Sequence, residues 1–237
     1  MSALGVADAA RNNAAWCSAV CGAHGSPGEF VDAYWRTRAA APTYYPNLVT
    51  LVPEPALALA GVRELERARP SASWAIKDSF GTLPLEHAGF DLLFEADWIV
   101  RPASPRRGPV AARWCSVQSE SELAAWENAW GQSVGQAPIF LPALLRRKEI
   151  AILAARDRDG EIVAGVVANR AANAVGITNL FLRRAEGEST RAECIEAVAD
   201  AFPGLPLVGY ESGQDLADSH ALGFSSLGSL RVWVKRA

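Results

Sequence analysis

Glu211 is the residue whose type and position point most directly to chemistry. It follows the apolar stretch Leu205–Tyr210, which predicts a buried strand, and it therefore stands at the end of that strand. Burial beside Tyr210 would raise the pKa of the Glu211 carboxyl toward neutrality. A carboxylate with such a pKa serves well as a general base. The alternative is a structural role, in which Glu211 only caps the turn after the strand.

Asn179 and Asp78 are the candidates for binding a substrate. Asn179 lies in the apolar stretch Thr178–Phe181, and a polar side chain inside a strand needs a hydrogen-bond partner. That partner is either a substrate or the backbone of the strand itself. Asp78 ends a predicted strand in the first half of the chain, directly after Lys77. The alternative for these two residues is a surface ion pair, which contributes little to stability.

The second half of the chain supplies a regular succession of elements to position these residues. Two capping boxes, Ser119/Glu122 and Thr190/Glu193, predict helix starts, and the glycine of turn 157–160 predicts a hairpin. Apolar periodicity then predicts a strand at 113–117, a helix after Ser119, strands at 149–156, 162–169 and 174–182, a helix ending at Phe202, a strand at 205–210, a helix at 215–222 and a strand at 230–235.

The first half is separated from the second by a proline-rich linker. Residues 101–109 contain three prolines, one glycine and three arginines, which suit neither a helix interior nor a central strand. We therefore expect two units, 1–103 and 110–237. In the first unit, the same patterns predict helices at 13–21 and 56–69 and strands at 48–52, 74–77 and 92–100.

A faint internal repeat crosses this linker. Asp78-Ser79 and Glu211-Ser212 match at an offset of 133 residues, and a second set of positions matches at 134, namely Gly89/Gly223, Phe90/Phe224, Leu93/Leu227 and Val100/Val234. The two halves are therefore predicted to be related folds, packed closely as parts of one sheet. The first half is expected to lack the opening strands.

Composition excludes several classes of partner. The chain has 237 residues, a formal net charge of −3 and no apolar run near the ~20 residues that span a bilayer. We therefore expect no nucleic-acid partner, no membrane partner and a cytoplasmic location. Cys17, Cys21 and His24 lack the second ligand pair that zinc sites usually have, so we expect buried structural thiols and no metal.

The order of the predicted elements, with the ending Ala221-Leu-Gly-Phe224 before the last strand, resembles the GNAT N-acetyltransferase superfamily. The resemblance covers about 125 residues and implies an α/β (α+β) fold with a mixed, mostly antiparallel central sheet and flanking helices, here in two related halves. In this family the fourth and fifth strands splay apart, and the pantetheine of acetyl-CoA lies in the gap.

The resemblance also implies a cofactor site along strand residues Leu180, Phe181 and Leu182 and in the loop that follows them. Arg184 and Gly187 match the pyrophosphate-binding pattern of the family, and Ser189 stands at its last position. Small residues there let backbone N–H groups face phosphates at a helix N-terminus. Glu186, Glu188 and the Thr190/Glu193 box oppose an anion at this point, so the alternative is a solvated turn.

For the reaction, the resemblance implies that Glu211 is the base. The acid in this family is usually a tyrosine, and Ser219 stands at its position, so Tyr210 or His220 would have to substitute. The implied function is an acyl-CoA-dependent N-acyltransferase that uses acetyl-CoA to acetylate a small amine, as a monomer or a homodimer. The alternative is a catalytically inactive GNAT-derived module that binds a small molecule or a protein.

Overall fold

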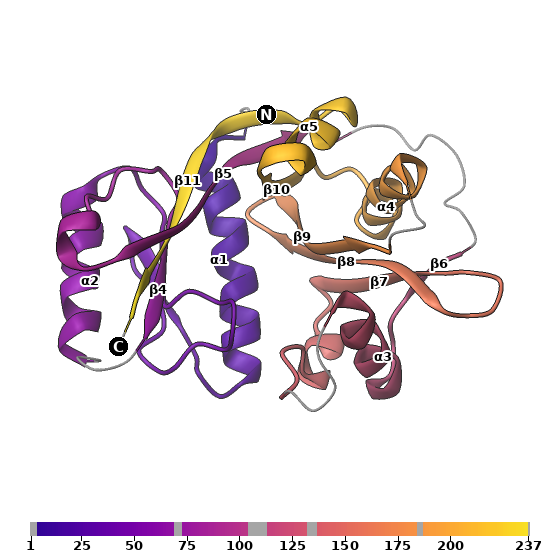
Figure 1. Cartoon of the computed structure of the whole chain (residues 1–237), viewed down its shortest axis with the longest axis horizontal. Coiled ribbons are helices and arrows are strands. Elements are labelled where there is room, and N and C mark those ends of the chain that lie inside the picture. Colours follow the sequence, from indigo (N-terminus) through magenta and orange to yellow (C-terminus); the bar gives the residue numbers. More distant parts are fainter. Residues whose placement is uncertain (1–3, 69–72, 104–112, 132–136, 184–186, 237) are drawn as a thin grey trace.

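A single mixed sheet runs through the whole molecule (Figure 1). The computed structural model describes residues 4–68, 73–103, 113–131, 137–183 and 187–236. In that part of the chain the sheet has eleven strands, in the order β1-β2-β3-β4-β11-β5-β10-β9-β8-β7-β6. They are β1 (Glu29–Phe30), β2 (Tyr34–Arg36), β3 (Leu48–Thr50), β4 (Trp74–Asp78), β5 (Asp91–Arg101), β6 (Trp114–Ser116), β7 (Ile150–Arg156), β8 (Ile162–Ala171), β9 (Ala174–Leu182), β10 (Leu207–Glu211) and β11 (Ser225–Lys235).

Helices cover both faces of the sheet. They are α1 (Val6–Ala23), α2 (Pro55–Ala68), α3 (Glu120–Trp130), α4 (Glu188–Ala201) and α5 (Gly213–Ala221), with short 3-10 turns η1 (Glu86–Ala88) and η2 (Pro142–Arg146). Figure 1 shows α1 over the centre of the sheet, α2 beside β4, and α4 and α5 beside β9 and β10. No described helix has the length and apolar character needed to cross a membrane. The predicted fold class, a mixed and mostly antiparallel sheet with flanking helices, is confirmed.

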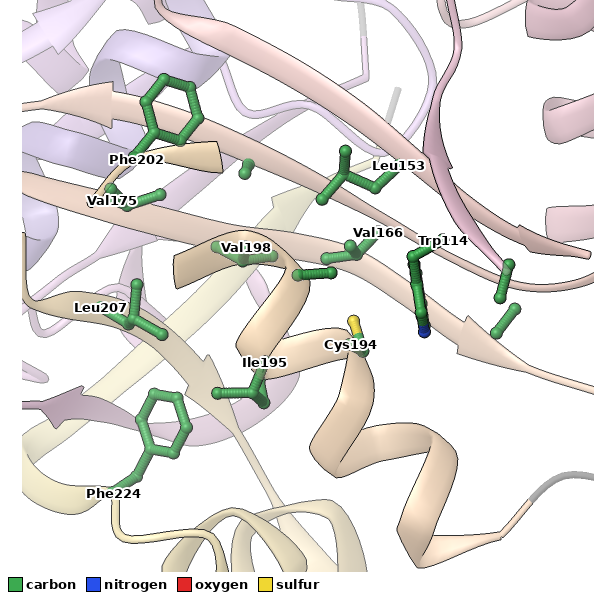
Figure 2. Packing of buried hydrophobic residues seen from close by; sticks show 14 of the residues in the cluster. Trp114, Leu153, Val166, Val175, Cys194, Ile195, Val198, Phe202, Leu207 and Phe224 are labelled. Atoms are coloured by element: carbon green, nitrogen blue, oxygen red, sulfur yellow. The ribbon is translucent and has the colours of Figure 1, made fainter. Parts of the chain in front are cut away.

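The apolar alternation of the strands explains how these layers form. In β7 and β8, Leu153 and Val166 face α4, whereas Ile152 and Val167 face α1 and α3. Figure 2 shows the α4 side of this core, where Cys194, Ile195 and Val198 of α4 pack onto the sheet together with Phe224. Burial of these side chains is the main stabilising contribution, about 25 cal/mol per Å² of apolar surface.

Buried amide groups attach α1 to the β8–β9 hairpin. The Asn12 Nδ2 atom donates to the carbonyl oxygens of Asn169, Ala171 and Ala174 at 3.2, 2.9 and 3.1 Å. Asn169 Nδ2 donates in return to the Asn12 backbone oxygen at 3.1 Å. These bonds fix α1, which belongs to the first half of the chain, on strands of the second half.

Strands β5 and β11 each pair with a strand from the other half of the chain. Strand β11, from the end of the chain, pairs with β4 of the first half, and β5 pairs with β10 of the second half. The β5–β11 ladder is symmetric about the Ala96–Leu230 pair, and each strand carries one extra residue, Leu93 in β5 and Leu227 in β11. These two residues are 134 positions apart, the offset seen in the sequence. The expected continuity of one sheet is present, whereas a common origin of the halves stays a prediction.

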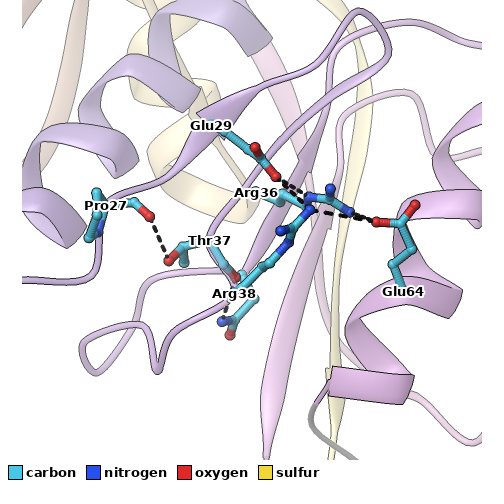
Figure 3. A network of polar contacts seen from close by, with 7 residues as sticks. Pro27, Glu29, Arg36, Thr37, Arg38 and Glu64 are labelled. Atoms are coloured by element: carbon cyan, nitrogen blue, oxygen red, sulfur yellow. Dashed lines mark hydrogen bonds and ion pairs between the residues drawn. The ribbon is translucent and has the colours of Figure 1, made fainter.

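Several predicted elements need correction. The first half has the short opening strands β1 and β2, which pair with each other and with β3. Figure 3 shows how they are held: Arg36 of β2 donates to Glu29 at 2.8 Å and also contacts Glu64 of α2. The Thr190/Glu193 capping box is also wrong. Helix α4 begins earlier, with Gly187 as its N-cap.

Candidate functional site

Strands β9 and β10 run parallel and then diverge. Two residue pairs join them, at positions 175–176 of β9 and 207–208 of β10. Further along, β9 has one more residue than β8 opposite, and Asn179 in this bulge has a φ of 53°. Asparagine adopts this left-handed conformation more readily than most residues. The bulge bends β9 away from β10 and explains the polar residue inside the strand. Its side chain has a partner, because Thr178 Oγ1 lies 3.1 Å from Asn179 Oδ1.

A narrow cavity occupies the gap between the diverging strands. Ile177 and Leu180 of β9 and Gly209 of β10 line it, and α4 and α5 close it from the side with further apolar residues. Gly209 lets the strands approach closely, because a Cβ at this position would lie 3.2 Å from the Ile177 carbonyl oxygen. The cavity is therefore a slot with apolar walls. Its polar side chains are Arg191, Glu211 and Ser219.

Glu211 is the titratable group of this slot. The pKa of its carboxyl is raised from 4.5 to about 7, mainly by burial and also by the nearby Asp215 carboxylate, while Arg191 acts in the opposite direction. The Glu211 carboxyl has no hydrogen-bond or ion-pair partner among the described residues. The direction of this shift agrees with the prediction, although Tyr210 lies on the opposite face of β10 and is not its cause. The group can exchange a proton near neutral pH.

Arg191 joins the two helices beside the slot. Its guanidinium, on the first turns of α4, lies 2.5 Å from an Asp215 oxygen and 3.8 Å from an Asp218 oxygen, both on α5. Neither Arg191 nor Asp215 is among the site residues predicted from the sequence. Their spacing in the sequence carries no signal for this contact, because it depends on how α4 packs against α5.

Of the other predicted catalytic residues, only Ser219 lies with Glu211. Ser219 is buried and lines the slot. Tyr210 projects from the opposite face of β10, where its ring packs edge-on against Trp98 at 5.5 Å. His220 is exposed, and its Nε2 lies 3.1 Å from Ser226 Oγ. The structure therefore brings Glu211 and Ser219 together and places Tyr210 and His220 elsewhere.

The predicted cofactor-binding residues divide in a similar way. Leu180 lines the slot, and Leu182 packs into the core below α4. Phe181 faces the other side of the sheet, where its ring packs edge-on against Trp126 at 5.3 Å. Arg184 lies outside the described residues. Gly187 is the N-cap of α4, and Ser189 is exposed in the first turn.

The start of α4 has no side-chain cap, contrary to the prediction. The two residues of the predicted box are used elsewhere, because Arg113 donates to Thr190 Oγ1 at 2.7 Å and to Glu193 Oε2 at 2.8 Å. The Thr190 and Glu193 side chains therefore do not occupy the first-turn N–H groups. The objection that this capping box would oppose an anion no longer holds. The positive end of the helix dipole lies at this N-terminus of α4.

Asp78 and Lys77 lie three strand spacings from β10, roughly 14 Å across the sheet. Asp78 is buried and accepts a hydrogen bond from the Leu83 N–H at 2.8 Å. Lys77 is also buried and donates to Asn13 Oδ1 at 2.9 Å. The alternative of a surface ion pair between these two residues is therefore wrong.

The described residues contain no group of three or more His, Cys, Asp or Glu side chains able to hold a metal ion. Cys17 and Cys21 are free thiols in the interior of the protein, and burial raises their pKa to about 11 and about 12. Thiols with such pKa values are poor nucleophiles and poor metal ligands at neutral pH. Both cysteines pack on the apolar side of α1.

Comparisons with known proteins complete the description of the fold. No family model matches the sequence, and no curated protein sequence is similar to it. A GCN5-related N-acetyltransferase from Kribbella flavida has a TM-score of 0.63 at 15% identity, covering 99% of this chain and 97% of that one. A putative acetyltransferase of the GNAT family from Novosphingobium aromaticivorans has a TM-score of 0.61 at 13% identity, with 94% and 98% covered. This chain has the GNAT fold.

The GNAT resemblance that the element order predicted is thus confirmed for the fold, and the splayed strands are β9 and β10. Another structural neighbour is Saccharomyces cerevisiae N-myristoyltransferase with bound myristoyl-CoA, with a TM-score of 0.50 at 10% identity. It covers 76% of this chain and 55% of its own length. The names of these neighbours refer to acetyl transfer and to myristoyl transfer. In this chain, Glu211 lies in the gap between the splayed strands of the fold.

Proposed function

We propose that this protein is an acyl-CoA-dependent N-acyltransferase that acetylates a small amine, with Glu211 as the general base. The observation that carries the proposal is the position of Glu211. Its carboxyl lies in the slot between β9 and β10, has no described partner and has a pKa of about 7. A structural carboxylate at the end of a strand would normally accept hydrogen bonds that hold it ionised.

The chemistry follows from the two polar groups in the slot. An acceptor arrives as an ammonium ion, and Glu211 removes one proton to free the lone pair of the nitrogen. The nitrogen attacks the thioester carbonyl carbon, so that a C–N bond forms and the C–S bond breaks. The second proton leaves the nitrogen and reaches the departing sulfur through the Ser219 hydroxyl, which passes it on without becoming charged. Glu211 then releases the first proton to water.

The residues around the slot support a CoA thioester as the donor, although the slot is closed in this structure, with a volume of about 10 Å³. The apolar walls at Ile177 and Leu180 suit the pantetheine arm, and the uncapped start of α4 at Gly187 offers backbone N–H groups to a pyrophosphate. Arg191, on the first turns of α4, is the described cation that lines the slot. For an acyl donor to enter, the contact between Arg191 and Asp215 has to open.

Calorimetric titration with acetyl-CoA, with CoA as a control, tests the donor site. Release of free thiol with a panel of small amines then tests turnover. We expect binding in the micromolar range and turnover that falls at least about a hundredfold in Glu211→Gln, while donor affinity is retained. The matched control is Glu161→Gln, which changes an exposed glutamate in the β7–β8 turn. Turnover that survives in Glu211→Gln would contradict the assignment of the base.

A second function is favoured by one observation, the contact of Arg191 with Asp215 and Asp218 beside a narrow slot that lacks a tyrosine acid. On this alternative the protein is a GNAT-derived binding module. It predicts no thiol release with any amine and no binding of acetyl-CoA. The variant Asp215→Asn removes the contact with Arg191. It would produce no activity in such a module, whereas in an enzyme it should ease entry of the acyl donor.

A further inference from the structure

Lys77 is a buried cation on the face of the sheet that α1 covers. Its residue exposure is 5%, and its Nζ atom donates to Asn13 Oδ1 at 2.9 Å. The same atom lies 4.1 Å from the centroid of the Tyr210 ring. Both partners are neutral, and no described carboxylate forms an ion pair with Lys77. A buried charge is stable only when it is paired. The described surroundings of Lys77 do not supply the negative group that would pair with it.

Lys77 reaches the candidate site from the opposite face of the sheet. Tyr210 directly precedes Glu211 in β10, and successive side chains of a strand point to opposite faces. Lys77 therefore contacts Tyr210, the neighbour of Glu211 that points to the other face of β10. This contact lies where β9 and β10 have already diverged. A ligand bound beside Tyr210 would lie next to the gap between β9 and β10, which holds the Glu211 carboxyl and the proposed thioester.

The neighbourhood of Lys77 offers both aromatic surface and an unused hydrogen-bonding group. Trp98 and Phe94 pack around the Tyr210 ring at centroid distances of 5.5 and 6.4 Å, and Phe94 is 37% exposed, so this surface begins at solvent. Directly after β4, Ser79 Oγ is buried and has no hydrogen-bond partner among the described residues. Unpaired buried hydroxyls are uncommon and indicate a missing partner.

We propose that the acceptor of the acyl group carries a carboxylate beside its amine, as an amino acid does, and that the Lys77 ammonium binds this carboxylate. This inference rests on the proposed N-acyltransferase function and names its substrate class. The aromatic residues around Tyr210 favour an acceptor with an aromatic side chain. The carboxylate supplies the negative charge that Lys77 lacks, and the amine is left to face the gap between β9 and β10.

The test compares L-phenylalanine with phenethylamine, which differs from it by the absence of the carboxylate. We expect the wild-type protein to prefer phenylalanine. Lys77→Met should raise KM for phenylalanine by about ten- to a hundredfold, the usual loss for a hydrogen bond between charged groups. KM for phenethylamine should stay within about twofold. An equal change in KM for both amines, or a wild-type preference for phenethylamine, would overturn the inference.

Two further variants separate binding from folding. Lys77→Arg keeps the positive charge and should retain the preference for phenylalanine, whereas Lys77→Gln should lose it as Lys77→Met does. Lys148→Met removes an exposed lysine after η2 and should change neither KM. Thermal unfolding of each variant identifies any that is not folded. If Lys77→Met is not folded, the comparison of Lys77→Gln with Lys77→Arg decides.

Titration of phenylalanine without donor distinguishes failure of this inference from failure of the proposed function. Binding to wild type that is lost in Lys77→Gln supports the carboxylate site even if no turnover is found. Absence of binding to wild type, in a protein that binds acetyl-CoA and acylates phenethylamine, overturns the carboxylate site and leaves the N-acyltransferase intact. Absence of acetyl-CoA binding overturns the proposed function alone.

Discussion

Replacing Glu211 with glutamine should change the way in which the free energy of unfolding depends on pH. The Glu211 carboxyl has a pKa of about 7 in the folded protein, against an ordinary value of 4.5. Each unit of difference corresponds to about 1.36 kcal/mol, so the ionised carboxylate destabilises the folded state by up to about 3 kcal/mol. Glutamine has a similar size and does not ionise.

The sign of the effect follows from where the proton is held. Below pH 4.5 the carboxyl is protonated in both the folded and the unfolded chain, and its ionisation does not affect stability. Between pH 4.5 and 7 the unfolded chain releases the proton while the folded protein keeps it, so stability falls as the pH rises. Above pH 7 the loss is complete. Glu211→Gln should therefore be more stable than wild type at pH 8 by up to about 3 kcal/mol, and this advantage should be absent at pH 4.

Urea unfolding of wild type and Glu211→Gln at pH 4, 5.5 and 8 measures this difference. Glu161→Gln, at an exposed glutamate, should show the pH dependence of wild type. Asp215→Asn should move the transition to lower pH, because Asp215 helps to raise the Glu211 pKa. Acyl transfer by wild type should rise with pH through the same range. If the stability difference between wild type and Glu211→Gln is the same at pH 4 and pH 8, Glu211 does not have a raised pKa in the folded protein.

Three other changes test the elements that build the site. Asn12→Ala leaves three carbonyl groups of the β8–β9 hairpin without their donor and should cost about 2–4 kcal/mol in urea unfolding; a loss below about 1 kcal/mol would contradict this role. Gly209→Ala places a Cβ 3.2 Å from the Ile177 carbonyl oxygen. It should weaken acetyl-CoA binding about tenfold in calorimetry, and an unchanged affinity would exclude the slot as the donor site. The fragment 113–237 lacks β5, the strand between β10 and β11, so we expect no cooperative thermal unfolding by circular dichroism; a sharp transition would show that the second half folds alone.

Local sequence signals predicted local structure well. Ser119 and Glu122 form the predicted capping box, with Ser119 Oγ accepting from the Glu122 N–H at 3.2 Å. The box at Thr190 and Glu193 has the same sequence pattern and does not form. Arg113, more than 70 residues away in the sequence, binds both side chains instead. A pattern that depends on neighbours in the chain can be overridden by a distant partner, which a single sequence does not reveal.

The repeat illustrates the same limit at the scale of the sheet. The offset of 134 matches Leu93 with Leu227, and each of them is the extra residue of a bulge in the β5–β11 ladder. The sequence could not show that β5 and β11 pair with each other and then with strands of the opposite half. The short strands β1 and β2 have two and three residues, too few for periodicity to appear.

The candidate site depends on a difference between two equivalent positions. Asp78 ends β4 and Glu211 ends β10, 133 residues apart, and each carboxylate follows a strand that runs parallel to its neighbour. In the first half the chain folds back after β4, so the Leu83 N–H donates to Asp78 and the Ser79 N–H donates to Thr50 Oγ1 at 2.7 Å. Those bonds hold β3 against β4 and use the carboxylate.

In the second half, the chain enters α5 directly after β10, and the bulge at Asn179 moves β9 away. Glu211 then receives none of the hydrogen bonds that Asp78 receives, and its pKa rises because burial is not compensated. The sheet thus places a carboxylate at both positions, and the segment that follows each strand decides whether that carboxylate supports the fold or remains available for chemistry. This difference is the physical reason to propose catalysis in the second half alone.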